Sequence, residues 1–325
     1  MPTFSAVVPS YNRARLLPET LNSLLAQKHA FDQIIIVDDG STDDTAAMVA
    51  ARYPECIFLS QKNGRQQRAR NTGIAAATSD WVVLCDSDDL LTPDYLSQIV
   101  ILLEDVPDLE VINCNRTKFG RDDSPREDIF SLAPPDLWTG LSETSTAYVG
   151  GGPEFSARLA RNRSILFWPT GLAVRRDFFG VVGLFDERMA PYIAEDVEFT
   201  LRSIADAKAG FLKAPVAQIR EHGQNFSRVP PRQALKDHVA VLEFCLQNHP
   251  HAQRDPLRQA ILARLERDRR NILYSAFREA DWQEVRWIAK DLSGCSLTAK
   301  ERLKIAIARL PNLLSNRLRD ASVSS

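Results

Sequence analysis

Two aspartates spaced two apart, Asp86 and Asp88, have the clearest chemical potential, and they follow a short apolar run at 81–85. In an extended chain, residues i and i+2 project from the same face, with Cα atoms roughly 7 Å apart. Two carboxylates so placed can bind a hard divalent cation, Mg²⁺ or Mn²⁺, and leave coordination positions for phosphate oxygens. The alternative is a solvated acidic turn before a helix, since carboxylates favour helix N-termini.

Two other apolar runs also end in polar residues. The run at 34–37 is followed by Asp38 and Asp39, and the run at 4–8 is followed by the sequence PSYNR. In open parallel sheets, ligands bind beyond the carboxyl ends of the strands, so these three segments are expected to share one rim. Such a concentration of carboxylates is costly unless a cation lies among them.

Other phosphate-binding and phospho-accepting sites fit the sequence less well. A dinucleotide-binding fold would carry GxGxxG after the first strand, where the sequence has PSYNRA, and no P-loop GxxxxGK[ST] is present. Diphosphate charge would therefore have to be met by a metal and basic side chains. A receiver domain needs an aspartate after its third strand, but SQKN follows the run at 56–59.

The elements that must position these residues alternate regularly over the first 115 residues. The continuous apolar run at 34–37 suits a central strand covered on both faces. One helix is predicted to start at a Ser41 or Thr42 cap and to run through Arg52, and another is predicted over 65–77. Alternating strands and helices predict an α/β fold with a Rossmann-like, mostly parallel, doubly wound sheet.

Composition narrows the class of protein. The chain has 325 residues and a net charge of −2, so a nucleic-acid partner is not expected. No apolar run approaches the roughly 18–20 residues needed to span a bilayer, and the N-terminus lacks the pattern of a signal peptide. The five cysteines are widely spaced without a CxxC pair, which favours reduced thiols and a cytoplasmic location.

Five segments resemble the ordered motifs of family 2 glycosyltransferases, which are generally inverting nucleotide-sugar enzymes of the GT-A fold. The segments are VVPSYNR at 7–13, IIIVDDGSTDDT at 34–45, NGRQQRARNTGIAAA at 63–77, WVVLCDSDD at 81–89 and VVGLFDERMAPYIAEDVEFTLR at 181–202. The resemblance covers about 3–230 and implies transfer of a sugar from a nucleoside-diphosphate sugar to a hydroxyl group.

The resemblance also implies roles for individual residues on the donor side. Pro9, Tyr11 and Asn12 would belong to the nucleotide-sugar site, with the ring of Tyr11 as a stacking surface for the base. Asp39 would accept hydrogen bonds from the base, and Arg70 would lie near the base or the phosphates. A UDP-sugar is the favoured donor.

A second set of implied roles concerns the metal and the acceptor. Asp88 would be the main ligand of Mn²⁺ or Mg²⁺, Asp86 would contact the metal or the ribose, and His222 would help to hold metal or diphosphate. Asp196 would be the general base on the acceptor hydroxyl, with Glu195 as the other candidate. For Glu195 and Asp196 the alternative is an acidic first helical turn, and for His222 it is a surface or capping histidine.

The remaining expectations concern organisation and partners. A catalytic domain is expected over 1–230, with a nucleotide-binding half at about 1–115 and an acceptor half at about 116–230, followed by a helical extension over 231–325. The basic amphipathic segment 299–325 suggests peripheral contact with the inner face of a membrane, with packing or oligomer contact as the alternative. The acceptor would be a glycan or a lipid-linked molecule of surface polysaccharide assembly, and a homo-oligomer is left open.

Two alternatives stay open from the sequence. Trp168 either stacks against a sugar face or is a core tryptophan before Pro169. The whole chain could also be a catalytically silent nucleotide-sugar-binding or scaffold protein of the same fold, although its retained carboxylates argue against that interpretation.

Overall fold

The N-terminal strands form the parallel half of a mixed sheet. β1 (Phe4–Ser10) pairs in parallel with β2 (Gln33–Asp38) and β4 (Trp81–Leu84), and β2 pairs in parallel with β3 (Ile57–Ser60). The computed structural model describes residues 1–120, 128–134, 136–162, 168–222 and 229–310. Over these residues the strand order along the sheet is β3-β2-β1-β4-β9-β6-β10-β8-β7, with β5 (Leu90–Leu91) paired to β10.

The second half of the sheet mixes directions. β6 (Val111–Phe119) and β10 (Lys208–Arg220) pair in parallel, whereas β9 (Leu172–Arg175) pairs antiparallel with both β4 and β6. β8 (Ala147–Gly151) pairs antiparallel with β10 and with β7 (Ser142–Glu143). The predicted α/β class is confirmed, and the antiparallel pairs lie in the half where sequence regularity fades.

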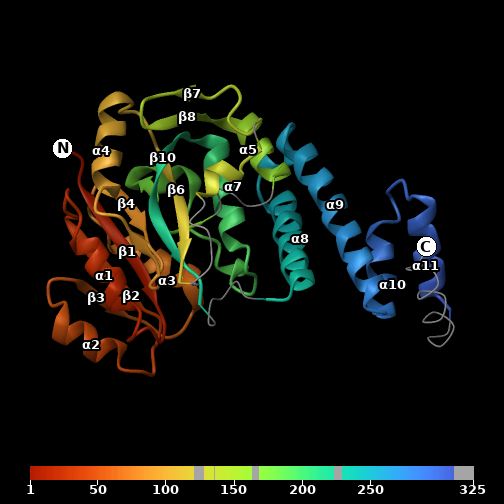
Figure 1. Cartoon of the computed structure of the whole chain (residues 1–325), viewed down its shortest axis with the longest axis horizontal. Coiled ribbons are helices and arrows are strands. Elements are labelled where there is room, and N and C mark those ends of the chain that lie inside the picture. Colours follow the sequence, from red (N-terminus) through yellow and green to blue (C-terminus); the bar gives the residue numbers. More distant parts are fainter. Residues whose placement is uncertain (121–127, 135, 163–167, 223–228, 311–325) are drawn as a thin grey trace. The chain divides into compact units, whose positions relative to one another are not determined.

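Both faces of β1 are covered, which explains why the strand is wholly apolar at its centre. Phe4, Ala6 and Val8 belong to a core that includes side chains of α1 (Leu17–Leu25) and α4 (Tyr95–Asp105). Val7, on the opposite face, meets α3 (Arg65–Ala76) at Gly73, where an added Cβ would lie 2.3 Å from Val7 Cγ1. The glycine therefore allows α3 to approach the sheet closely (Figure 1).

The predicted start of the second helix was wrong. α2 (Thr45–Arg52) begins later, because Ser41 and Thr42 are engaged by the loop after β1. The backbone N–H of Asn12 donates to Ser41 Oγ at 2.8 Å, and Asn12 Oδ1 accepts from the backbone N–H of Thr42 at 2.8 Å. Asn12 has a φ of 53°, a conformation that asparagine tolerates better than most residues.

The segment that the sequence left unassigned contains an aromatic core. Trp138 stacks on Tyr148, with ring centroids 4.6 Å apart, and it also contacts Phe130, Phe155 and Phe211. Phe155 lies on α5 (Gly152–Arg161), which packs near α7 (Glu195–Asp206). Glu195 and Asp196 open α7. A short helix, α6 (Phe179–Val182), follows β9 along the chain.

The chain divides into two compact units, of which the second is helical. The first unit holds 1–191 and 195–225, and the second holds 192–194 and 226–325. In the second unit α8 (Pro231–Asn248) and α9 (Leu257–Arg278) lie side by side, followed by α10 (Trp282–Asp291) and α11 (Ala299–Ala308) (Figure 1). Within the part of the chain that the structure describes, no helix is long and apolar enough to cross a membrane.

The described part of the basic C-terminal segment packs within the helical unit. Ile305 and Ile307 of α11 are buried, and Thr298 and Glu301 form a reciprocal N-terminal cap. Glu301 also pairs with Arg270 of α9. The apolar face that suggested a membrane surface is thus used, up to residue 308, for internal packing, and residues 311–325 lie outside the described part of the chain.

Candidate active site

The polar ends of β1, β2 and β4 meet at one edge of the sheet, as their parallel pairing requires. In the register, Ser10 of β1 lies opposite Asp38 of β2, and Val7 lies opposite Leu84 of β4. The backbone N–H of Asp39 donates to the carbonyl of Ser10 at 2.8 Å, which ties the first two ends together. The rim therefore combines the segments that carry the candidate donor-binding residues.

Asp86 and Asp88 each use one carboxylate oxygen in an ion pair. Asp86 Oδ1 lies 2.9 Å from Arg70 Nη2, and Asp88 Oδ2 lies 3.3 Å from Arg13 Nη2 and 2.9 Å from His222 Nε2. The second oxygen of each carboxylate has no hydrogen-bond partner among the residues that the structure describes. The predicted neighbours Asp88 and His222 therefore do meet, and Arg13 joins them.

This arrangement fits a divalent cation that the substrate helps to coordinate. The described residues contain no cluster of three or more His, Cys, Asp or Glu side chains with the geometry of a complete metal site. Mg²⁺ and Mn²⁺ at phosphate-binding sites are commonly held by one or two carboxylates together with phosphate oxygens. The free oxygens of Asp86 and Asp88 are hard donors of that kind, so the residues present fit such an ion.

Asp89 lies behind this pair and organises the surrounding backbone. Its Oδ2 accepts from Thr170 Oγ1 at 2.7 Å and Trp168 Nε1 at 3.3 Å, and its Oδ1 accepts from the backbone N–H of Arg220 at 2.8 Å. Burial, with the charges of Asp88 and Asp86, holds the pKa of Asp89 well above its ordinary value. Asp89 is therefore a structural link between β4, β10 and the segment before β9.

The residues assigned to the nucleotide sugar occupy different environments. Tyr11 is 46% exposed, so its ring can stack on a ligand, whereas Pro9 is buried within β1. Asn12 is engaged by the loop after β2, as described above. Asp39 is buried, and its Oδ1 accepts from Gln61 Nε2 at 2.7 Å and from the backbone N–H of Gly64 at 2.8 Å. Tyr11 is thus exposed to solvent and can meet a ligand, unlike Pro9 and Asp39.

Arg70 connects the donor side of the site to the acidic pair on α7. Its side chain is 1% exposed, and its Nη1 lies 3.0 Å from Glu195 Oε1 while Nη2 contacts Asp86. Gln66, one turn earlier on α3, also donates to Glu195 Oε1. Burial lowers the pKa of the guanidinium, but the two carboxylates outweigh burial and raise the pKa above its ordinary value. Arg70 therefore stays charged.

Asp196 and Glu195 are adjacent but differ in their partners. Glu195 is buried and bound to Arg70 and Gln66, whereas Asp196 is partly buried and forms no ion pair or side-chain hydrogen bond with the described residues. Burial and then the charge of Glu195 raise the pKa of Asp196 well above its ordinary value, against the opposing effect of Arg70. Asp196 is the carboxylate available to take up a proton.

A buried arginine near Asp196 was not found from the sequence. Arg116 of β6 is 3% exposed, and its guanidinium lies 5.4 Å from the centroid of the Trp168 ring. Burial lowers its pKa to about 10, although the charges of Asp196 and Asp89 oppose the change. Trp168 is partly buried between this cation and Asp89, so it is neither a wholly buried core residue nor an open stacking platform.

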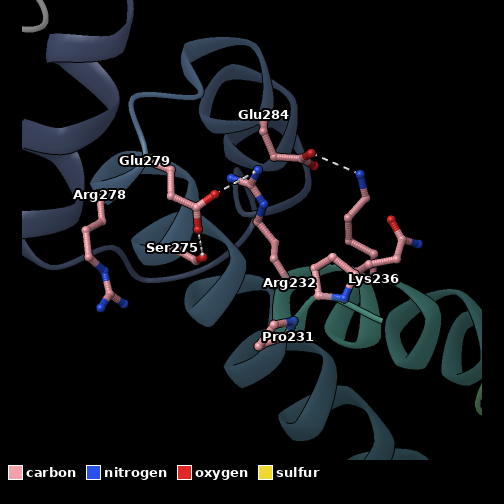
Figure 2. Close-up of a pocket in the computed structure, with 9 residues that line it drawn as sticks. Pro231, Arg232, Lys236, Ser275, Arg278, Glu279 and Glu284 are labelled. Carbon is pink, nitrogen blue, oxygen red and sulfur yellow. Dashed lines mark hydrogen bonds and ion pairs between the residues drawn. The ribbon is translucent and has the colours of Figure 1, made fainter. Parts of the chain in front are cut away.

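A cavity of about 480 Å³ lies in the helical unit, at the ends of α8, α9 and α10 (Figure 2). Lys236 pairs with Glu284 at 2.9 Å, and Arg232 pairs with Glu279 at 3.2 Å and Asp281 at 3.0 Å. These charges neutralise one another, and the residues that line the cavity include none of the candidate site residues predicted from the sequence.

The chain is similar to known proteins in sequence and in fold. The family model for glycosyl transferase family 2 matches residues 5–177. The uncharacterized glycosyltransferase EpsJ of Bacillus subtilis (strain 168) is 27% identical over 246 residues, which cover 74% of this chain and 67% of EpsJ. The chain spans only about a third of the length of several other curated relatives that it matches.

Solved structures share the fold at low sequence identity. Residues 1–349 of Staphylococcus aureus TarS in complex with UDP-GlcNAc superpose with a TM-score of 0.62 at 19% identity, covering 89% of this chain and 80% of that one. The mannosyltransferase PcManGT of Pyrobaculum calidifontis, in complex with GDP-Man and Mn²⁺, gives a TM-score of 0.55 at 19% identity, covering 98% and 87%. These likenesses confirm the GT-A type of fold.

Replacing Arg70 by methionine is expected to destabilise the protein strongly. The change leaves Glu195 buried without its cation, and removing one partner of a buried ion pair costs about 3–5 kcal/mol. The free energy of unfolding in urea measures the effect. The matched control is Arg68→Met on the exposed face of the same helix, which should change it by less than about 0.5 kcal/mol. A loss below 1 kcal/mol for Arg70→Met would show that the bridge is not needed for folding.

Asp196→Asn is expected to make the protein more stable than the wild type at neutral pH. A carboxyl group whose folded pKa is raised binds its proton more tightly in the folded state, so wild-type stability falls as pH rises from the ordinary value of 3.8 through the folded pKa. The advantage of the variant should grow across that window, by about 1.4 kcal/mol for each pH unit between the two pKa values.

Urea unfolding of both proteins between pH 4 and pH 8 tests this expectation. Asp136→Asn, a change at an exposed aspartate, serves as the control and should show no such trend. A stability difference between Asp196→Asn and the wild type that stays constant with pH would contradict a raised pKa at Asp196.

Proposed function

Because the chain belongs to glycosyl transferase family 2, we propose that it transfers a sugar from a nucleoside-diphosphate sugar to a hydroxyl group with inversion at the anomeric carbon. In this reaction the acceptor oxygen forms a bond to the anomeric carbon, and the bond from that carbon to the diphosphate breaks on the opposite side. The acceptor proton passes to a carboxylate, and the nucleoside diphosphate leaves. No covalent bond to the protein is needed.

The observation that carries this proposal is the contrast between the two acids on α7. Asp196 forms no ion pair with the residues that the structure describes, and its pKa is raised, which suits a general base that must take a proton during attack. The side chain of Glu195 is fixed by its contacts with Arg70 and Gln66. We therefore assign the base to Asp196 and a supporting role to Glu195.

The donor would lie along the edge formed by β1, β2 and β4. The ring of Tyr11 would stack on the base, Asp39 would contact it through the oxygen that Gln61 and Gly64 leave free, and Asp86 and Asp88 would face the diphosphate. His222 and Arg13 adjoin Asp88 and supply positive charge or hydrogen bonds there. This use of the rim agrees with the general position of ligands in open α/β sheets.

A divalent ion belongs to this proposal. Asp88 and Asp86 would hold it, with His222 beside them, and when bound it would offset the negative charge that develops on the leaving diphosphate. The complex of PcManGT with GDP-Man and Mn²⁺ supports the use of a divalent metal. Arg70 binds Oδ1 of Asp86, which leaves Oδ2 for the ion.

For the donor and the acceptor we propose only the chemical class. UDP-GlcNAc in the complex of TarS supports the UDP-sugar that the sequence favoured, and GDP-Man in the complex of PcManGT makes a GDP-sugar the alternative. A glycan or lipid-linked hydroxyl of surface polysaccharide assembly remains the proposed acceptor. We propose that 1–230 carries the catalysis and that 231–325 is an extension to it, with a homo-oligomer left open.

Any peripheral contact with an anionic membrane would involve the end of the chain. Ile305 and Ile307 are buried within the helical unit and cannot insert into lipid. The proposal of membrane contact through 299–325 therefore narrows to the residues after 310, which contain Arg317 and Arg319.

Calorimetric titration with UDP, GDP, dTDP and CDP, each with and without Mn²⁺, tests the proposed function. We expect one nucleotide to bind only in the presence of the metal, and Asp88→Ala to weaken that binding about tenfold or more, which corresponds to about 1.4 kcal/mol. The reason is that Asp88 supplies a metal ligand which the diphosphate cannot replace.

Asp196→Asn is the matched control for the titration. It should bind the nucleotide as tightly as the wild type, because its carboxylate lies on the acceptor side, yet it should lose hydrolysis of the donor sugar by water. Folded wild-type protein that binds none of the four nucleotides would overturn the transferase proposal and favour the silent scaffold.

A further inference from the structure

A buried phenylalanine connects α3 with the start of α7. Phe185 is 4% exposed, and its ring stacks on that of Phe199 of α7, with ring centroids 4.1 Å apart and ring planes at 13° to each other. The guanidinium of Arg70 lies 5.4 Å from the centroid of the same ring, within the range of a cation–π contact. The ring therefore contacts both the buried cation of α3 and the helix that begins with Glu195 and Asp196.

The backbone of Phe185 is held by the side chain of Asn71, which follows Arg70 on α3. Asn71 Oδ1 accepts from the backbone N–H of Phe185 at 3.0 Å, and Asn71 Nδ2 donates to the carbonyl oxygen of Phe185 at 2.9 Å. An asparagine amide carries both an acceptor and a donor, so it can satisfy the two backbone groups at once. An alanine at this position could satisfy neither of them.

Arg202 of α7 anchors the residue that precedes Phe185. Its Nη2 donates to the carbonyl oxygen of Leu184 at 2.9 Å, while its Nε donates to Glu198 Oε1 at 2.6 Å. The segment at 184–185 is therefore bonded to α3 through Asn71 and to α7 through Arg202. Because one short segment is bonded to both helices, it restrains how α3 and α7 lie relative to each other.

The ring of Phe185 also restricts the orientation of the Arg70 guanidinium. Nη1 of Arg70 contacts Glu195 and Nη2 contacts Asp86, whereas Nε has no hydrogen-bond partner among the described residues. Two contacts still allow the planar group to rotate about the line that joins them. The aromatic ring opposes this rotation, because the guanidinium must stay over the ring to keep the cation–π contact.

We propose that Phe185 is a positioning residue, which orients Arg70 and holds the first turns of α7, so that Asp196 meets the attacking oxygen in the correct geometry. This inference rests on the proposed function, because it takes Asp196 as the base. It gives a part in the reaction to the segment at 184–185, which lies beyond the family match that ends at residue 177. Misplacing a reacting group by about 1 Å costs as much as 100-fold in rate.

Phe185→Leu and Phe179→Leu, compared in the full-length protein, separate this role from simple packing. Phe179 is also buried and contacts Phe199, at 6.2 Å between ring centroids, but among the described residues it forms no cation–π contact with Arg70. Both variants should unfold at lower urea concentration than the wild type. Only Phe185→Leu should lower kcat, by at least tenfold, and Phe185→Tyr should recover most of the rate because it keeps the ring.

The nucleotide site should be largely unaffected by Phe185→Leu. Asp86 is held independently at the end of β4, since its backbone N–H donates to Thr170 Oγ1 at 3.0 Å, and Asp88 has partners of its own. The Kd of UDP or GDP in the presence of Mn²⁺ should therefore stay within about threefold of the wild-type value. The kcat is measured for hydrolysis of UDP-GlcNAc or GDP-Man, according to which of the two nucleotides binds.

Hydrogen exchange at the backbone amide of Phe185, followed by NMR, provides a readout that does not depend on activity. This amide should exchange slowly in the wild type and in Phe179→Leu, and at least tenfold faster in Asn71→Ala, which removes its acceptor. An equal rate in Asn71→Ala would contradict the role of Asn71 in holding the segment.

The inference is overturned if kcat of Phe185→Leu equals that of the wild type, if Phe179→Leu lowers kcat to the same extent, or if nucleotide affinity falls as much as kcat. A wild-type protein that binds a nucleotide but shows neither transfer nor donor hydrolysis would instead overturn the proposed function. Faster exchange in Asn71→Ala would then still support the contact itself.

Discussion

The guanidinium of Arg70 joins two acidic segments that lie far apart in the sequence. It contacts Asp86, which follows β4, and Glu195, which begins α7, 125 residues further along the chain than Arg70. A cation that is 1% exposed is tolerated only where carboxylates compensate for its lost hydration. The two segments must therefore stay close for the protein to remain folded, and the proposed donor and acceptor sides of the site are held together by the same contact that stabilises them.

The position of Asp196 follows from this constraint. Arg70 pairs with Glu195 and Asp86, whereas Asp196 forms no ion pair with the described residues. Burial and then the charge of Glu195 raise the pKa of Asp196, against the opposing effect of Arg70. The other acidic residues of the rim have partners. Asp88 contacts Arg13 and His222, and Asp89 accepts hydrogen bonds from several donors. In the proposed function, Asp196 is thereby kept ready to accept a proton, while its neighbours hold the structure or would face the diphosphate.

Much of the parallel half of the sheet could be predicted from the sequence. The apolar runs that end in acidic residues and glycine indicate where the strands lie and which strand ends share one edge of the sheet. Asp88 and His222 were paired by resemblance and meet in the structure. The roles of Arg70 and Arg116 in bridging and burial could not be predicted, because an arginine in a motif shows no sign of which distant carboxylate or ring it will meet. The start of α2 was missed for a similar reason, since Asn12 from another loop engages the expected capping residues.

The pKa of the Asp196 carboxyl group, measured by ¹³C NMR titration and assigned by its absence in Asp196→Asn, tests this account most directly. The account predicts a value clearly above the ordinary 3.8 in the wild type, and a lower value in Glu195→Gln, where the adjacent charge is removed. An ordinary value in the wild type, or no change in Glu195→Gln, would contradict the claim that the Arg70 bridge and its buried glutamate prepare Asp196 to act as the base.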